Sequence, residues 1–171
     1  TSLLSVAKEY IRHKYHKPGN VFLGIVSRLD APVTGVVLIA RTSKAAARLS
    51  EQYRQRDVEK RYWALVERVH TPVAGTWTDW LRKDERHRKV LASVRGELGA
   101  QEAVLSYRTL DGTRRPVLVE IELETGRKHQ IRVQLSSHGL PVLGDRKYGS
   151  AVPFEPGIAL HARELKFSHP T

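Results

Sequence analysis

Two segments joined by a turn constrain the fold of this chain more than any other feature. In residues 116–124 apolar residues alternate with mostly acidic ones, and the regularly spaced apolar positions are Val117, Val119, Ile121 and Leu123. A period of two places those side chains on one face of a strand and leaves the other face solvated. Residues 101–109 form a second strand, and Asp111-Gly112 between the two is a hairpin signal. The pattern predicts a hairpin with one buried face.

Helical and extended segments surround this hairpin. Helical spacing is found in residues 3–17, 44–55 and 129–137, and further strands are predicted for residues 21–26, 35–40, 61–69 and 160–167. The run 35–40 is apolar on both faces, which is typical of a central strand covered on both sides. Thr42 or Ser43 can cap the second helix. Since strands outnumber helices and some are linked by hairpins, we predict an α+β (mixed α/β) protein.

Charge and composition narrow the function. The 171 residues contain 29 Lys and Arg against 18 Asp and Glu, a net charge of +11, with neither cysteine nor methionine. This length favours a single domain, residues 1–171. The missing cysteines exclude a disulfide framework, a thiol nucleophile and Cys-ligated metals. The longest apolar run is far shorter than the ~18 residues of a membrane span, so we expect no membrane partner. A strongly basic chain favours a polyanion, nucleic acid first.

The segment 81–95 has two interpretations. It carries six Lys and Arg and two acidic residues. It is either a mobile hairpin that grips a phosphate backbone or a solvated loop.

Three short segments could carry chemistry. Arg28 and Asp30 share a face of an extended chain, where a guanidinium favours an ionised carboxylate, although a strand-end salt bridge is the commoner explanation of such a pair taken alone. Lys60 and Tyr62 share a strand face on which a tyrosine could stack on a base or exchange a proton. Arg127 and Lys128 stand at a predicted helix start, where anions are preferred, which suggests that they face a carboxylate or a phosphate. The eight histidines form no convincing metal set.

Together these segments resemble the RluA-type RNA pseudouridine synthases. That family shows His-Arg-Leu-Asp-x-x-Thr-Ser-Gly, Lys-x-Tyr-x-Ala-x-Val and Thr-Gly-Arg-Thr-His-Gln-Ile-Arg, then Gly-Asp-x-x-Tyr-Gly and a Leu-His-Ala strand that ends in Phe-x-His-Pro. The matches in order are Arg28-Leu29-Asp30 with Gly35, Lys60 with Tyr62, Thr125 to Arg132, Gly144-Asp145 with Tyr148-Gly149, and Leu160-His161-Ala162 with Phe167, His169 and Pro170. The resemblance runs from about Val21 to Pro170.

The chain departs from the family pattern at a few positions. Ser27 replaces the usual histidine, Val33-Thr34 replaces Thr-Ser, and Lys128 replaces the threonine after Arg127. The family's opening strand with Asn-Lys-Pro-x-Gly has no counterpart, so we expect the N-terminal segment of its domain to be missing here.

The resemblance implies a fold, a reaction and roles. The fold would be the pseudouridine synthase catalytic fold, a largely antiparallel mixed sheet with a central cleft flanked by helices. The reaction would isomerise uridines of ribosomal or transfer RNA to pseudouridine without cofactor or metal. Asp30 would be the catalytic carboxylate, whether it attacks the sugar, attacks the base or removes a sugar proton, and Arg127 would be its ion-pair partner. Tyr62 would pack on the detached base and assist proton transfer.

The remaining implied roles concern RNA binding. Arg28 would help to flip the target nucleotide, Leu160 would line the base pocket, and Lys60, Lys128 and Arg132 would contact the RNA. We expect a cytoplasmic monomer that requires no protein partner. Two alternatives are an RNA-binding relative without catalysis, which would not need Asp30, and a phosphodiesterase or other hydrolase, for which no metal cluster or histidine pair is found.

Overall fold

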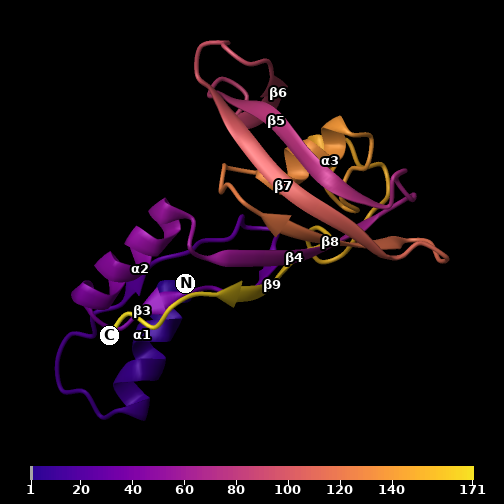
Figure 1. Ribbon diagram of the computed structural model, residues 1–171. Coiled ribbons are helices and arrows are strands. Elements are labelled where there is room, and N and C mark those ends of the chain that lie inside the picture. Colours follow the sequence, from indigo (N-terminus) through magenta and orange to yellow (C-terminus); the bar gives the residue numbers. More distant parts are fainter. Residues whose placement is uncertain (1) are drawn as a thin grey trace. The chain divides into compact units, whose positions relative to one another are not determined.

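The computed structural model describes residues 2–171, which divide into two compact units (Figure 1). The first unit contains residues 2–29, Val37–Val58 and Phe167–Thr171, and the second contains Asp30–Val36 and Glu59–Lys166. The single catalytic domain and the central cleft expected from the sequence remain predictions.

The first unit consists of two helices and a short ribbon. Its elements are α1 (Leu3–Lys14), β1 (Gly24–Ile25), β3 (Ile39–Ala40) and α2 (Ser43–Gln55), with β1 antiparallel to β3. The Thr42 hydroxyl accepts a hydrogen bond from the Ala45 amide at 3.1 Å, which confirms the predicted start of α2. The helix α1 is also confirmed, although it ends three residues before the predicted end.

The second unit is built on a seven-stranded sheet. The sheet has the order β2-β9-β4-β8-β7-β5-β6. Its strands are β2 (Thr34–Gly35), β4 (Glu59–Val66), β5 (Ala74–Asp84), β6 (Lys89–Ser93), β7 (Ala100–Asp111), β8 (Val117–Leu123) and β9 (Leu160–Lys166). Every neighbouring pair is antiparallel except β2 with β9. The predicted α+β class with a largely antiparallel mixed sheet is therefore confirmed.

The core of this unit lies between the sheet and α3 (Gln130–Ser137). The predicted hairpin is formed by β7 and β8, and the four alternating apolar residues of β8 are at most 9% exposed. They belong to one cluster with Ile131 and Leu135 of α3. Because burial of each large apolar side chain is worth roughly 1.5–3 kcal/mol, this cluster fixes α3 on the sheet.

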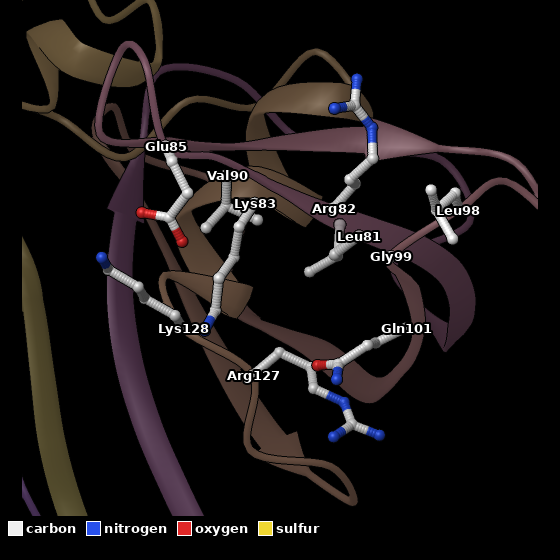
Figure 2. Close-up of a pocket in the computed structure, with 10 residues that line it drawn as sticks. All are labelled: Leu81, Arg82, Lys83, Glu85, Val90, Leu98, Gly99, Gln101, Arg127 and Lys128. Atoms are coloured by element: carbon white, nitrogen blue, oxygen red, sulfur yellow. The ribbon is translucent and has the colours of Figure 1, made fainter.

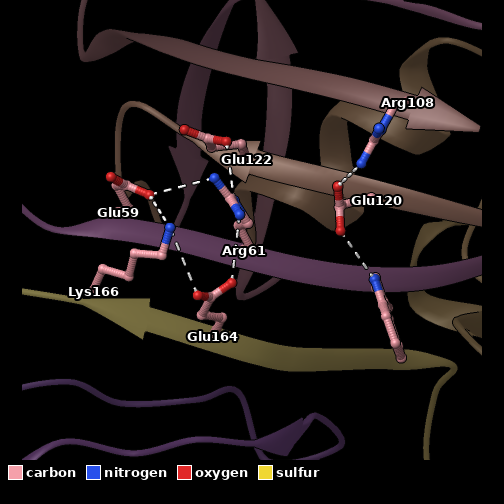
Figure 3. A network of polar contacts seen from close by, with 8 residues as sticks. Glu59, Arg61, Arg108, Glu120, Glu122, Glu164 and Lys166 are labelled. Atoms are coloured by element: carbon pink, nitrogen blue, oxygen red, sulfur yellow. Dashed lines mark hydrogen bonds and ion pairs between the residues drawn. The ribbon is translucent and has the colours of Figure 1, made fainter.

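Ion pairs cover part of the opposite face of the sheet (Figure 3). Arg61 of β4 lies within 3.5 Å of carboxylate oxygens from Glu59, Glu122 and Glu164. Side chains alternate between the two faces of a strand, and Tyr62 and Ala64 pack against the core on the α3 side. The charged side chains of this network therefore lie on the opposite face. The hydrogen bond with Glu122 is the main cause that raises the pKa of Arg61. This face is therefore electrostatically balanced by its own residues.

The predicted central strand 35–40 is wrong. Thr34 and Gly35 pair with β9 in the second unit, whereas Ile39 and Ala40 pair with β1 in the first. Val36 is 44% exposed, so the run is not covered on both faces. An apolar run alone does not tell one strand from two short ones. The predicted strand 21–26 is likewise reduced to β1.

The basic segment 81–95 forms the end of β5, a turn and β6. The hairpin in the first interpretation is thus present. Its contact with a phosphate backbone remains a prediction.

Gly35 makes the close contact between β2 and β9 possible. Its φ is +123°, and a Cβ atom built there would lie 2.2 Å from the Ala162 carbonyl oxygen. The Val36 amide donates a hydrogen bond of 2.8 Å to that same oxygen. A side chain would force β2 away from β9.

We predict that Gly35→Ala lowers the free energy of unfolding by about 3 kcal/mol, because backbone strain and steric overlap add. Denaturant unfolding followed by circular dichroism measures the change. Gly19→Ala is the control, since nothing lies within 4 Å of a Cβ at that position. Equal stability of the two variants would contradict the prediction.

Candidate active site

Buried hydrogen bonds fix the conformation of the loop that precedes α3. The Thr125 hydroxyl accepts a hydrogen bond from the Val104 amide of β7 at 2.8 Å and donates one to Gln130 Oε1 at 2.9 Å. Gln130 Oε1 also accepts from the Arg127 amide, and Gln130 Nε2 donates to the Val104 carbonyl. These contacts attach residues 125–130 to β7, so the side chains of the loop are presented from a fixed backbone. Thr125 thus binds β7 rather than capping α3.

Arg132 of α3 lies between two carboxylates. Its Nε and Nη2 donate to the two oxygens of Asp145 at 2.6 and 2.9 Å, and its Nη1 donates to Asp30 Oδ2 at 2.9 Å. The side chain of Asp145 is 1% exposed, while that of Asp30 is 28% exposed. One carboxylate therefore holds the guanidinium inside the protein, and the other is accessible from outside.

The charge of Arg132 is stabilised where it lies. Burial tends to lower the pKa of its guanidinium, but the hydrogen bonds to Asp145 and Asp30 outweigh burial and raise the pKa. Bidentate pairing of a guanidinium with a carboxylate fixes direction as well as distance. Arg132 therefore remains positively charged and holds the carboxylate of Asp30 in a fixed orientation.

His129 and Tyr148 complete the surroundings of Asp30. His129 Nε2 lies 3.7 Å from Asp30 Oδ2, and its Nδ1 lies 2.6 Å from the Tyr148 hydroxyl. That hydroxyl also accepts a hydrogen bond from the Val90 amide. The Arg132 guanidinium lies 4.9 Å from the centre of the Tyr148 ring. His129 has a left-handed φ of 54°, a conformation that concentrates at functional sites.

The predicted pairing of Arg127 with Asp30 is wrong. Arg127 Nε donates to the Glu102 carbonyl at 2.9 Å, and the guanidinium bound to Asp30 belongs to Arg132, five residues later. Arg127 and Lys128 precede the helix instead of opening it, because α3 begins at Gln130. The misfit of two bases at a helix N-terminus was thus not the relevant signal. A catalytic role of Arg127 and an RNA contact of Arg132 remain predictions.

The other predicted residues are distributed over both units. Tyr62 and Lys60 lie on the β4 face that packs toward α3, Lys60 being buried and Tyr62 partly buried. Leu160 is buried in the core cluster and borders an apolar pocket of about 230 Å³. Lys128 is exposed in the loop before α3. Arg28 is exposed and belongs to the first unit, two residues before Asp30 in the chain.

Asp145, Tyr148 and His129 were not predicted as site residues. The signal for Asp145 was available, because Arg132 lies between Ile131 and Val133 in a helix whose first six residues are buried. A buried arginine needs a carboxylate. The tyrosine and the histidine lie in two of the quoted family motifs, but their contact with each other is visible only once α3 and the turn η1 (Arg146–Tyr148) are placed.

Within residues 2–171, no group of three His, Asp or Glu side chains is arranged to hold a metal ion. No helix in the same range is long and apolar enough to cross a membrane.

We predict that Asp145→Asn destabilises the protein by about 3 kcal/mol, because it removes one partner of a buried ion pair. Glu164→Gln is the matched control: it removes a carboxylate from the exposed network of Figure 3 and should change stability by less than about 1 kcal/mol. Chemical denaturation of both variants measures the difference. Equal losses would show that Asp145 does not hold Arg132.

Burial, which outweighs the attraction of Asp30, lowers the pKa of His129 below its ordinary value of about 6.5. The unfolded chain therefore binds the histidine proton first as pH falls, and the contribution of His129 to stability is present above about pH 6.5 and is lost below it. We expect the free energy of unfolding to fall less in His129→Gln than in wild type between about pH 7 and pH 5. Denaturant titrations across this range test the difference, and parallel curves would contradict it.

Comparison with known proteins identifies one family of similar sequences and structures. Residues 3–137 match the family described as RNA pseudouridylate synthase. The chain is 36% identical over 150 residues to an uncharacterised RNA pseudouridine synthase of Synechocystis sp., covering 86% of this chain and 46% of that protein. It is 35% identical over 161 residues to ribosomal large subunit pseudouridine synthase D of Xanthomonas campestris, covering 86% and 47%. The chain thus spans about half the length of these curated relatives.

A solved structure shows the same fold. The human RNA pseudouridylate synthase domain containing 4 superposes with a TM-score of 0.82 at 28% identity, over 96% of this chain and 74% of that one. The resemblance to the RluA-type synthases, which rests on five ordered motifs, is confirmed by the family match and by these relatives. The chain belongs to the RNA pseudouridylate synthase family.

Proposed function

We propose that this chain carries the catalytic part of an enzyme that isomerises uridine in RNA to pseudouridine, with Asp30 as the reacting carboxylate. The observation that carries the proposal is the pairing of Asp30 with a buried arginine that a second, buried carboxylate holds in place. A surface salt bridge would not need that second carboxylate.

The geometry suits a carboxylate that meets a substrate. Arg132 engages Oδ2 of Asp30, and the partial exposure of Asp30 leaves the carboxylate accessible. Preorganised groups in a partly enclosed site contribute to catalysis because they need no reorientation during the reaction. Asp30 is held in this sense, whereas Asp145 has no access to a ligand.

The proposed reaction is balanced without an added reactant. The bond from N1 of uracil to C1′ of the ribose breaks, a bond from C5 to C1′ forms, C5 loses its proton and N1 gains one. Asp30 attacks the sugar, attacks the base or removes a sugar proton, and each route requires it beside the flipped nucleotide. Tyr62 packs on the detached uracil and assists the removal of the proton from C5. Leu160 lines the base pocket, and Arg28 assists base flipping.

The distribution of charge supports RNA as the substrate. On the sheet face away from α3, carboxylates neutralise Arg61, Arg108 and Lys166. On the side of α3, Arg127 and Lys128 have no ion pair within residues 2–171. Arg127 and Lys128 would thus meet the RNA on the side where Asp30 lies. The RNA contacts of Lys60 and Arg132, which are both buried, enter the proposal from the family resemblance alone. We further propose that the protein acts in the cytoplasm as a monomer and that its substrate is ribosomal or transfer RNA.

We predict that Asp30→Asn abolishes pseudouridine formation while changing RNA affinity by less than about threefold, because one carboxylate adds little to phosphate binding. Loss of a reacting group should lower turnover by roughly three orders of magnitude or more. Release of tritium from RNA labelled at uracil C5 measures turnover, and fluorescence anisotropy measures binding.

Two outcomes would contradict the proposal. Turnover retained in Asp30→Asn would exclude Asp30 as the reacting group. Wild-type protein that binds cellular RNA but releases no tritium would instead identify an RNA-binding relative without catalysis.

A further inference from the structure

A second cavity lies in the same unit as Asp30 but is formed by other residues. It has a volume of about 350 Å³, within the range of small-molecule sites. Its walls come from the hairpin β5–β6, the segment before β7 and the loop before α3. In Figure 2, Lys83, Glu85 and Lys128 lie on one side of the cavity and Leu98 on the other, with Arg127 at its lower edge.

The cavity carries excess positive charge. Four of its lining residues are basic and one, Glu85, is acidic. Arg82 is paired with Glu97 at 2.8 Å. Lys83, Arg127 and Lys128 form no ion pair with any carboxylate of residues 2–171, and Lys83 and Lys128 are exposed. Three basic groups are therefore available to one anionic ligand.

The cavity also has an apolar surface. Leu81 and Val90, at 3% and 2% exposure, form part of its wall, while Leu98 is 94% exposed at its border. A leucine with that exposure contributes almost no buried apolar surface to the stability of the fold. A ligand with both a charged group and an apolar part would use both surfaces.

The cavity is joined to the candidate active site by short contacts. The Val90 amide donates to the Tyr148 hydroxyl, which bonds to His129 beside Asp30. In the chain, Arg127 and Lys128 directly precede His129. The cavity and the surroundings of Asp30 are therefore bordered by the same loop.

We propose that this cavity binds a nucleotide that flanks the target uridine in the same RNA strand. Its phosphate lies against Lys83, Arg127 and Lys128, and its sugar or base lies over Leu98. The assignment rests on the proposed function for the identity of the strand, but the cavity binds RNA whether or not Asp30 reacts. Phosphate contacts position an RNA, and stacking or apolar contact with an unpaired nucleotide adds affinity.

The test uses a fluorescein-labelled single-stranded oligouridylate of about 12 nucleotides. The double variant Lys83→Ala/Lys128→Ala should bind it about tenfold more weakly. The slope of log Kd against log salt should fall by roughly 1.4, since each phosphate contact in single-stranded RNA contributes about 0.7. Both lysines are exposed, so the fold should be unchanged.

The matched control is Lys17→Ala/Lys44→Ala, which removes two exposed lysines of the first unit and so changes the net charge equally. We expect its salt slope to stay at the wild-type value. If the Lys83/Lys128 variant has the same slope as this control, the phosphate contact is overturned.

Leu98→Ser separates a nucleotide from a bare phosphate. It should weaken binding by about threefold at an unchanged salt slope, because an apolar contact releases no counterions. Unchanged affinity would overturn the apolar half of the proposed site.

Tritium release by the wild-type protein and RNA binding by the Lys83/Lys128 variant together distinguish this proposal from the proposed function. If the wild-type protein releases no tritium yet the Lys83/Lys128 variant still loses RNA affinity and salt slope, the synthase activity fails while the nucleotide site stands. If tritium is released normally but the lysine variant binds like wild type, the nucleotide site fails alone.

Discussion

The ion triad of Asp145, Arg132 and Asp30 is the interaction on which the candidate site depends. Taking a guanidinium out of water is costly unless carboxylates satisfy it, and Arg132 makes three hydrogen bonds to two of them. The triad ties α3 to the turn η1 and to the segment that carries Asp30. A buried pair of this kind is weak evidence for stability alone. Its direction is what matters here, because the third donor of Arg132 points to the one accessible carboxylate.

A second set of contacts connects the triad to the basic hairpin. Tyr148 lies under the guanidinium of Arg132, and its hydroxyl bonds both to His129 and to the backbone of β6. Burial raises the pKa of the Tyr148 hydroxyl, so it remains a hydrogen-bond donor. The position of β6 and the surroundings of Asp30 therefore depend on the same side chain. This connection links the position of the hairpin to the surroundings of Asp30.

The periodic patterns of the sequence were sufficient to predict most helices and strands, but not which strands and side chains pair with one another. The alternation in 117–123 and the cap at Thr42 are local signals, and both are confirmed because local spacing determines which face is buried. The run 35–40 was misassigned since its division between two units depends on the partner strands, above all on the close approach of Gly35 to Ala162. No periodicity contains that information.

The sequence predicted Arg127 as the partner of Asp30, whereas the structure has Arg132, and the cause of this error is similar. Both arginines occur in one motif, and the charge at a helix start favoured the first of them. The decisive fact is burial: Arg132 is enclosed by the first turns of α3 and needs carboxylates, whereas Arg127 can bond to a backbone carbonyl. Asp145 comes from a turn 13 residues later in the chain, so its pairing is a product of tertiary structure.

The basic side chains of the second unit divide into those that carboxylates neutralise and those without a carboxylate partner. Arg61, Arg108 and Lys166 are neutralised on one face of the sheet, and Arg132 is neutralised inside it. Three bases without a carboxylate partner, Lys83, Arg127 and Lys128, line the cavity beside the loop before α3. A polyanion is attracted chiefly by unpaired charges, because the fields of the two members of an ion pair largely cancel. Salt screens this attraction beyond a Debye length of about 10 Å. In the proposed function, these three bases would therefore attract the RNA backbone toward the loop that precedes α3, which also carries His129 beside Asp30.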